Sequence, residues 1–359
     1  MHVLLAGRVA ASPDQGGASW AVVQWALGLR ALGHRVTVVE QLAAPSTREQ
    51  STYARTVERQ TGVATSLITG ASADLVRSIG PVDLLVNLSG VLRNPALLAS
   101  VPRRLYVDLD PGFTQVWHAQ GADVGLSDHT AYATVGLRLG AADCPVPTGG
   151  LDWIPVPPPV VLEQWAPGAP VRGAAATSVG HWRSYGPVTH NGLHYGQRAH
   201  SARRLLHLPA RSPLPLRLAL GISPDETADL AALREHGWQL RDPYRVAGTP
   251  ADYRAFVRGS SAELGIAKSG YVDARTGWFS DRSACYLAAG RPVVAQETGW
   301  SRVLPDGPGL HAYTDVDGAA AALEAVMTDP AGEAAAAHAV AREHLDARRV
   351  LGRLLEQVA

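Results

Sequence analysis

The sequence predicts an α/β protein made of two doubly wound domains that face each other across a cleft. The chain has 359 residues, which suggests two compact units at about 150 residues per domain. Apolar runs typical of buried parallel strands alternate with helical segments on both sides of one proline-rich stretch. The domains are therefore expected to pair a parallel sheet with helices on both of its faces.

The first half begins with a strand, a helix and a second strand. Residues 2–7 (HVLLAG) are a continuous apolar run, and residues 18–32 carry apolar positions at helical spacing. Residues 33–40 (GHRVTVVE) supply a glycine that ends the helix and then another strand. Further strands are expected over 83–89, 104–110 and 131–136. These elements predict an N-terminal domain over residues 1–160.

Clustered prolines in residues 145–171 end this pattern. Proline fixes φ and lacks a backbone donor, so neither a helix nor a central strand is expected to persist through PVPTGG and PVPPPVVLEQWAPGAPV. This stretch is the predicted domain connection, and a second domain is expected over 161–340.

The second domain repeats the alternation. Strands are expected over 175–180, 216–221, 237–242, 262–268, 291–296 and 310–313. Helices are expected over 225–236, 250–259 and 280–290. The end of the chain is strongly helical, and residues 341–359 are predicted to pack back across both domains.

Composition excludes several classes of protein. The formal net charge is zero, which gives no support to nucleic-acid binding through phosphate neutralisation. Cys144 and Cys285 are the only cysteines, too few for a disulfide framework and without metal-ligand spacing. No signal peptide and no membrane span of roughly 18 apolar residues is recognised. We therefore expect a cytoplasmic protein without a metal site or cofactor.

Lys268 is the only lysine in the chain, and the remaining basic residues among the 32 are arginine. It is expected at the carboxyl end of the strand over 262–268, where ligands bind in open parallel sheets. A compact ammonium suits a phosphate. The sequence predicts that Lys268 neutralises a departing diphosphate, with an ordinary surface lysine as the alternative.

Two loops are expected to face the same cleft. Gly16 and Gly17 precede a helix whose free N–H groups suit a phosphate or a sugar hydroxyl, although the loop has neither a dinucleotide fingerprint nor a Walker lysine and could be a plain turn. Ser280 is predicted to cap a helix with Asp281, Arg282 and Ser283 in its first turn. A positively charged arginine is unfavourable near the positive end of the helix dipole, and a bound anion facing it would compensate for this. The alternative is a solvated surface arginine.

Acid–base candidates follow two strands of the first domain. Asp108, Asp110, His118, Asp128 and His129 are expected near strand ends, where a carboxylate or imidazole could deprotonate a hydroxyl. Asp110 and His129 are the catalytic candidates. Capping of a turn by Asp110 and surface packing of His118 stay open as alternatives.

The segment after the first strand of the second domain, residues 180–200, is rich in histidine, arginine and aromatic residues. This composition is suited to contacts with a sugar or a nucleotide, and Arg183 is the candidate taken from it.

Taken together, these segments resemble GT-B glycosyltransferases, which consist of two Rossmann-like domains facing a cleft. The order P-x-x-GG, helix, LGHRVTVVE is similar to the N-terminal signature of family 4-type enzymes. YLAAGRPVVAQETG and LPDGPGLHAY are similar to their C-terminal segments. DLDPGFTQVWHAQG, AKSGY and GWFSDRSACYLAAGRPVVAQ resemble a bacterial group of glycosyltransferases.

The resemblance carries over some positions and breaks at others. The two glutamates of family 4 would fall on Gly277 and Cys285, so the usual ribose contact and the retaining mechanism do not transfer, and Asp281 is a candidate substitute. Gly16, Gly17 and the helix start over 280–283 carry over as phosphate contacts. By position, three further residues match the loop that touches the donor sugar: Gln296, Glu297 and Thr298.

The resemblance implies a metal-independent hexosyltransferase. It would move a sugar from a nucleoside diphosphate donor to a hydroxyl of a small molecule or glycan, with Lys268, Arg282 and Arg183 stabilising the departing diphosphate. Neither nucleic acid nor membrane is an expected partner. A catalytically silent nucleotide-sugar-binding protein and a sugar-nucleotide epimerase are the alternatives.

Overall fold

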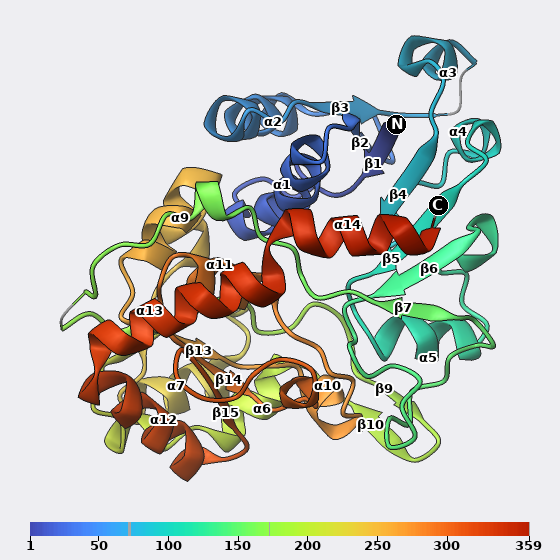
Figure 1. The fold of residues 1–359 in the computed structure, drawn as a ribbon. Coiled ribbons are helices and arrows are strands. Elements are labelled where there is room, and N and C mark those ends of the chain that lie inside the picture. Colours follow the sequence, from blue (N-terminus) through green and yellow to red (C-terminus); the bar gives the residue numbers. More distant parts are fainter. Residues whose placement is uncertain (71–72, 172, 359) are drawn as a thin grey trace.

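The computed structural model describes residues 1–70, 73–171 and 173–358, and it contains two parallel sheets with helices around them (Figure 1). Carboxyl edges of both sheets face the space between the domains. The expected pair of doubly wound domains is confirmed.

The first sheet has the order β3-β2-β1-β4-β5-β6-β7, and all its pairs are parallel. Its strands are β1 His2–Ala6, β2 Arg35–Gln41, β3 Thr65–Ile68, β4 Leu84–Leu88, β5 Arg104–Asp108, β6 Ala131–Thr134 and β7 Trp153–Pro155. Its helices are α1 Gly16–Ala31, α2 Arg48–Thr61, α3 Ala73–Ile79, α4 Pro95–Ser100 and α5 Phe113–Ala119. The strand order reverses between β1 and β4, which is where ligands bind in such sheets.

The second sheet has the order β12-β11-β8-β13-β14-β15 and is also parallel throughout. Its strands are β8 Ala176–His181, β11 Leu216–Gly221, β12 Gln239–Leu240, β13 Ala262–Gly265, β14 Val293–Gln296 and β15 Leu310–Tyr313. Helices α6 Arg198–Arg204, α7 Thr227–Glu235, α8 Pro243–Val246, α9 Pro250–Arg258, α10 Ser269–Asp273, α11 Asp281–Ala288, α12 Val316–Thr328 and α13 Pro330–Val340 surround it. Short 3-10 turns cover Leu126–Asp128, Leu162–Gln164, Leu208–Ala210 and Trp300–Arg302.

The end of the chain returns to the first domain. After α13, a π-helical turn over Ala341–Leu345 leads into α14, Ala347–Val358, which lies against α1 (Figure 1). A Cβ on Gly28 of α1 would lie 2.7 Å from Leu351 and 2.8 Å from Ala347, so the glycine permits this close packing. Val160 bonds both sides of the turn, donating to Leu345 O and accepting from Ala347 N. Ala359, the last residue of the predicted segment 341–359, lies outside the described residues.

Aromatic side chains join the domains at their cores. The Trp20 ring on α1 lies 5.0 Å from that of Trp165, which in turn lies 6.1 Å from that of Tyr253 on α9. Trp20 and Trp165 are fully buried, and each such side chain contributes roughly 2–3 kcal/mol through burial. The Trp20 indole N–H also donates to Pro250 O across the interface.

Two local predictions need correction, and one short strand was not predicted. The strand expected over 262–268 ends at Gly265, so Lys268 lies beyond it as the residue that precedes α10. Strand β5 ends at Asp108, which leaves Asp110 in the following turn. Within the proline-rich stretch, residues 153–155 form β7, an edge strand, which is where a sheet tolerates proline.

An antiparallel hairpin, β9 Val188–His190 and β10 Leu193–Tyr195, was not expected from the sequence. It turns through Asn191 and Gly192, both with positive φ. This hairpin places the residues that follow β8 against the first domain, because Gln120 of the first domain donates to Thr189 O.

Candidate functional site

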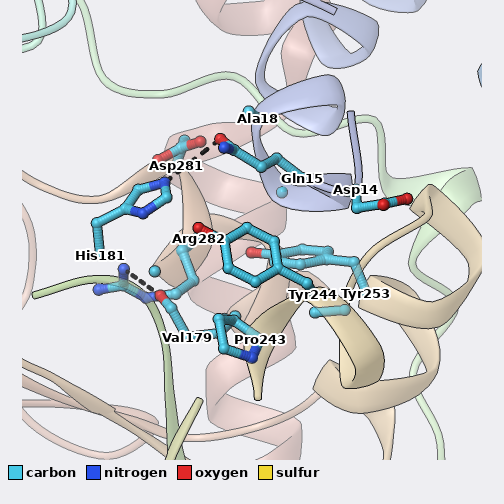
Figure 2. Close-up of a pocket in the computed structure, with 14 residues that line it drawn as sticks. Asp14, Gln15, Ala18, Val179, His181, Pro243, Tyr244, Tyr253, Asp281 and Arg282 are labelled. Atoms are coloured by element: carbon cyan, nitrogen blue, oxygen red, sulfur yellow. Dashed lines mark hydrogen bonds between the residues drawn. The ribbon is translucent and has the colours of Figure 1, made fainter. Parts of the chain in front are cut away.

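A cavity of about 180 Å³ lies between the domains and is called the interdomain cavity (Figure 2). It is bounded by the start of α1, the end of β8, the loop around α8, and the start of α11. Its lining residues are Asp14, Gln15, Gly16, Gly17, Ala18, Val179, Gly180, His181, Pro243, Tyr244, Ala247, Tyr253, Asp281 and Arg282. The structure therefore brings together two loops that the sequence predicted to share a cleft.

The glycines at the start of α1 allow the two domains to touch. Gly16 N–H donates to Ala247 O at 3.1 Å, and a Cβ on Gly16 would lie 2.2 Å from Thr249 O. A Cβ on Gly17 would lie 2.8 Å from the Tyr253 ring. In this closed arrangement the Gly16 N–H group is already hydrogen-bonded to a carbonyl of the second domain.

Glu40, at the end of β2, shapes the loop that precedes these glycines. Its buried carboxylate accepts hydrogen bonds from the N–H groups of Val9, Ala10 and Ala11 at 3.0, 2.6 and 2.9 Å. Sequence reasoning did not identify Glu40, although a carboxylate that ends an apolar strand was visible in VTVVE.

Arg282 is buried at the start of α11 and is not a surface arginine. Its Nε donates to the Glu263 carboxylate, and its Nη1 donates to Val179 O at 2.9 Å. Burial lowers the pKa of Arg282, but the charge of Glu263 and its hydrogen bond, together with the nearby Tyr253 and Asp281, outweigh burial, and the net shift is upward. Ser280 caps the helix by accepting from Arg282 N at 3.2 Å, as predicted, and Ser283 is buried behind it.

Arg198, the first residue of α6, is a second buried guanidinium at this place. Its Nε donates to Ile266 O at 2.8 Å and its Nη1 donates to His181 O. Among the described residues it has no carboxylate within ion-pair distance. Burial, followed by the charge of Arg282, lowers the pKa of Arg198 to about 10.

The two guanidinium groups converge behind Gly180, and of the two arginines Arg282 lines the interdomain cavity. A Cβ on Gly180 would lie 2.9 Å from Nη1 of Arg198 and 3.5 Å from Nη1 of Arg282. Gly180 has a φ of 148°. Because a side chain here would contact both guanidiniums, glycine keeps open the path from the cavity to the two cations.

Asp281 and His181 are two further titratable groups of the cavity (Figure 2). Asp281 is exposed to the cavity but lies deep between the domains, and this burial raises the pKa of its carboxyl against the effect of Arg282. Burial, with the charges of Arg198 and Lys268, lowers the pKa of His181. His181 is therefore neutral near pH 7, and its Nε2 lies 3.3 Å from Gln15 Oε1 across the cleft.

Lys268 forms a second interdomain contact, here called the lysine cluster, with Asp110, Tyr185 and Tyr271. Its Nζ donates to Asp110 at 3.0 and 2.8 Å and to the Tyr185 hydroxyl at 2.5 Å. Hydroxyl groups of Tyr185 and Tyr271 also donate to Asp110. The Nζ atom lies 4.3–5.3 Å from three aromatic ring centroids, those of Phe113, Tyr185 and Tyr271.

The single lysine of the chain thus forms an interdomain ion pair with Asp110, and 11% of its side chain is exposed. Burial lowers the pKa of Lys268, and the charge of Asp110 opposes that effect. Asp110 already accepts bonds at both carboxylate oxygens, so neither partner is free in this arrangement.

Asp108 fixes the turn that carries Asp110. The Asp108 carboxylate is fully buried and accepts from Asp110 N, Thr114 Oγ1, Gln115 Nε2 and Thr134 Oγ1 at 2.7–2.9 Å. Burial raises the pKa of Asp108 against these four bonds. Its role in this structure is to position the turn.

A larger cavity of about 520 Å³, called the lateral cavity, lies on the first-domain side. Its lining residues are Arg8, Ala18, Ala21, Val22, Leu88, Ser89, Val91, Arg93, Tyr106, Leu109, Asp110, Thr114, Trp117, Asp123, Val124 and Tyr185. It shares Ala18 with the interdomain cavity. Both cavities therefore border the first turn of α1.

Several predicted site residues do not line the interdomain cavity. Arg183 pairs with Glu226. His129 is buried, its Nδ1 lying 2.7 Å from Gly125 O and its Nε2 3.1 Å from Asn87 Nδ2, so neither ring nitrogen is free for a substrate. His118 and Asp128 also lie outside the cavity lining.

The predicted sugar-contact loop after β14 makes bonds within the second domain. Gln296 Oε1 accepts from Ala267 N at 3.2 Å, Glu297 accepts from Gly299 N, and Thr298 Oγ1 donates to Trp278 O at 2.6 Å. In this arrangement Gln296 holds the backbone just before Lys268, and Thr298 holds that of Trp278.

Solved structures with the same architecture cover the whole chain. HepE from Anabaena in complex with UDP and glucose has a TM-score of 0.65 at 14% identity, covering 100% of this chain and 99% of its own. Sucrose-phosphate synthase from Thermosynechococcus elongatus gives 0.62 at 15%, covering 100% and 99%. An α-glucosyltransferase in complex with UDP-glucose and DNA gives 0.67 at 10%, covering 99% and 98%.

These neighbours are GT-B glycosyltransferases, and the chain has the GT-B fold that was predicted. No protein-family model and no curated protein sequence matches the chain. Within the described ranges, none of the helices has the length and apolar character needed to cross a membrane.

Proposed function

We propose that this protein is a glycosyltransferase that moves a sugar from a nucleoside diphosphate donor to a hydroxyl of a small molecule or glycan. The observation that carries the proposal is that two cavities share Ala18 in their walls. One is lined by a helix start and by the buried Arg282, with Arg198 behind Gly180, and the other lies over the opposite sheet. A transferase needs two such sites side by side so that donor and acceptor react without diffusing apart.

The donor diphosphate would lie at the start of α11, in front of Gly180. Free N–H groups and the positive end of a helix favour an anion there, and Arg198 and Arg282 lie behind the glycine. Tyr244 and Tyr253 line the same cavity and offer ring faces for a base. Neighbours of the same fold bind UDP, so UDP is the first nucleotide to test.

Departure of the diphosphate would be assisted by fixed positive charge. Negative charge grows on the leaving group, and preorganised donors that face it lower the barrier most. Arg198 and Arg282 supply that charge from the protein, so the proposed reaction needs no metal. Asp281, exposed in the same cavity, would accept hydrogen bonds from the ribose hydroxyls of the donor nucleotide in place of the missing glutamates.

At 180 Å³ the interdomain cavity is smaller than the roughly 300–1,000 Å³ of typical ligand sites. Donor entry therefore requires the domains to separate at Gly16–Ala247 and in the lysine cluster. Closure of the domains after the donor has bound would exclude water and limit hydrolysis of the donor. In this scheme Lys268 acts on domain closure, and it reaches a phosphate only after releasing Asp110.

Turnover of nucleotide sugars tests the proposal. Purified protein is incubated with UDP-, GDP-, dTDP- and ADP-sugars, with and without a mixture of hydroxyl acceptors, and release of the nucleoside diphosphate is measured. Acceptor-dependent release supports a transferase. Conversion of the sugar without acceptor would establish an epimerase, and binding without any turnover would establish a silent binding protein.

A further inference from the structure

The lateral cavity is built at the reversal of strand order in the first sheet. Arg8 follows β1, Ser89 follows β4 and Asp110 follows β5, and these strands are neighbours in the order β1-β4-β5. Three polar side chains from separate turns thus reach one cavity. Such convergence of polar groups at the carboxyl edge of a parallel sheet is typical of a ligand site.

The charges around this cavity do not balance. Arg93 donates to Asp123 at 3.1 Å, and Lys268, beside the cavity, pairs with Asp110. Arg8 is exposed and has no hydrogen-bond or ion-pair partner among the residues that the structure describes. One guanidinium in the wall is therefore left for an anion that the protein does not itself supply.

Most of the remaining wall is apolar and aromatic. Tyr106, Trp117 and Tyr185 contribute rings, and the centroids of Trp117 and Tyr185 lie 4.7 Å apart. Aliphatic side chains complete this wall: Val22, Leu88, Val91 and Leu109. Such a surface packs against a planar or ring-shaped molecule.

Ser89 adds a strained polar group. It has a φ of 54°, although it is not glycine, and it is exposed at the cavity. Non-glycine residues held at positive φ cost free energy and gather at binding and active sites. The turn after β4 therefore presents a serine hydroxyl where the backbone alone would prefer glycine.

We propose that the acceptor is a hydroxylated ring compound that carries a carboxylate or phosphate. Its anionic group would bind Arg8, and its ring would pack against Trp117 and Tyr185. Its hydroxyl would point toward Ala18, which the lateral cavity and the interdomain cavity share in their walls. This inference rests on the proposed function, because it names the class of the second substrate.

Two matched pairs of probes test the inference by calorimetry in the presence of UDP. 4-Hydroxybenzoate is compared with 4-hydroxybenzyl alcohol, and glucose 6-phosphate with glucose, which separates an aryl from a sugar ring. The charged member of at least one pair should bind at least roughly tenfold more tightly than its neutral partner, because it gains a charge-assisted hydrogen bond. Arg8→Gln should remove that preference, whereas Arg234→Gln, an exposed arginine of α7 outside the cavity, should keep it.

The inference is overturned if charged and neutral probes bind equally in both pairs, if none of the four binds, or if Arg8→Gln keeps the preference. UDP binding, measured separately, distinguishes this failure from failure of the proposed function. If the charge preference is found but UDP does not bind, the lateral cavity prefers anions and the proposed transferase function fails. If UDP binds but the charge preference is absent, the donor site stands and the inference about the acceptor fails.

Discussion

Buried cations lie at the carboxyl edge of the second sheet both in the lysine cluster and beside the interdomain cavity, but the groups that surround them differ. Lys268 has a carboxylate, a phenol and three aromatic rings around it. Arg198 donates to two backbone carbonyls and, among the described residues, has no carboxylate within ion-pair distance. The difference suggests that the first is a structural joint between the domains, whereas the second is kept ready for an anionic ligand.

Removal of the lysine should have the largest effect on stability. Lys268→Ala leaves Asp110 partly buried without its cation, and breaking a buried pair from one side costs about 3–5 kcal/mol, with the lower end expected because 23% of the Asp110 side chain is exposed. Chemical denaturation measures the loss. The double variant Lys268→Met with Asp110→Asn should recover much of it, and equal instability of the single and double variants would contradict the structural assignment.

A methyl group at Gly16 should open the closed arrangement on the cavity side. Its Cβ would lie 2.2 Å from Thr249 O, and overpacking of this kind costs about 1–3 kcal/mol. Small-angle scattering of Gly16→Ala should report a larger radius of gyration and denaturation a lower stability. The control is Gly352→Ala on α14, where nothing lies within 4 Å of the added Cβ; that change should stabilise slightly. An unchanged Gly16→Ala protein would show that the contact with Thr249 does not hold the domains together.

The smallest effect is expected at Asp281 and depends on pH. Burial raises the folded pKa of Asp281 above its ordinary value of 3.8. The folded state therefore binds more protons than the unfolded state, and ionisation of this carboxyl lowers stability as pH rises. Asp281→Asn should therefore raise the melting temperature slightly near pH 7, and the gain should vanish near about pH 4. An increase in melting temperature that is the same at both pH values would show that ionisation of Asp281 is not its cause.

The sequence predicted the two-domain architecture because each buried parallel strand is a continuous apolar run, as in HVLLAG. It did not predict the β9–β10 hairpin, whose strands are three residues each and carry histidine and threonine instead of an apolar pattern. Helix starts such as Ser280 were predictable because a cap is a local interaction.

The site was less predictable because its contacts are long-range. Lys268 and Asp110 were both selected, but 158 residues separate them in the chain, and their pairing depends on how the domains dock. Arg183 and Arg198 lie in the same polar segment, and periodicity does not say which of them turns inward. Arg183 was the candidate, whereas Arg198 is the one that the structure buries behind Gly180.

The affinity of UDP for Arg198→Gln tests the account most directly. Calorimetry would compare the wild type with Arg198→Gln and with Arg183→Gln, whose arginine pairs with Glu226 away from the cavity. We predict that Arg198→Gln binds UDP about 10–100-fold more weakly, and that Arg183→Gln binds within about twofold of the wild type. Wild-type affinity in Arg198→Gln would contradict the claim that this uncompensated guanidinium belongs to a diphosphate site.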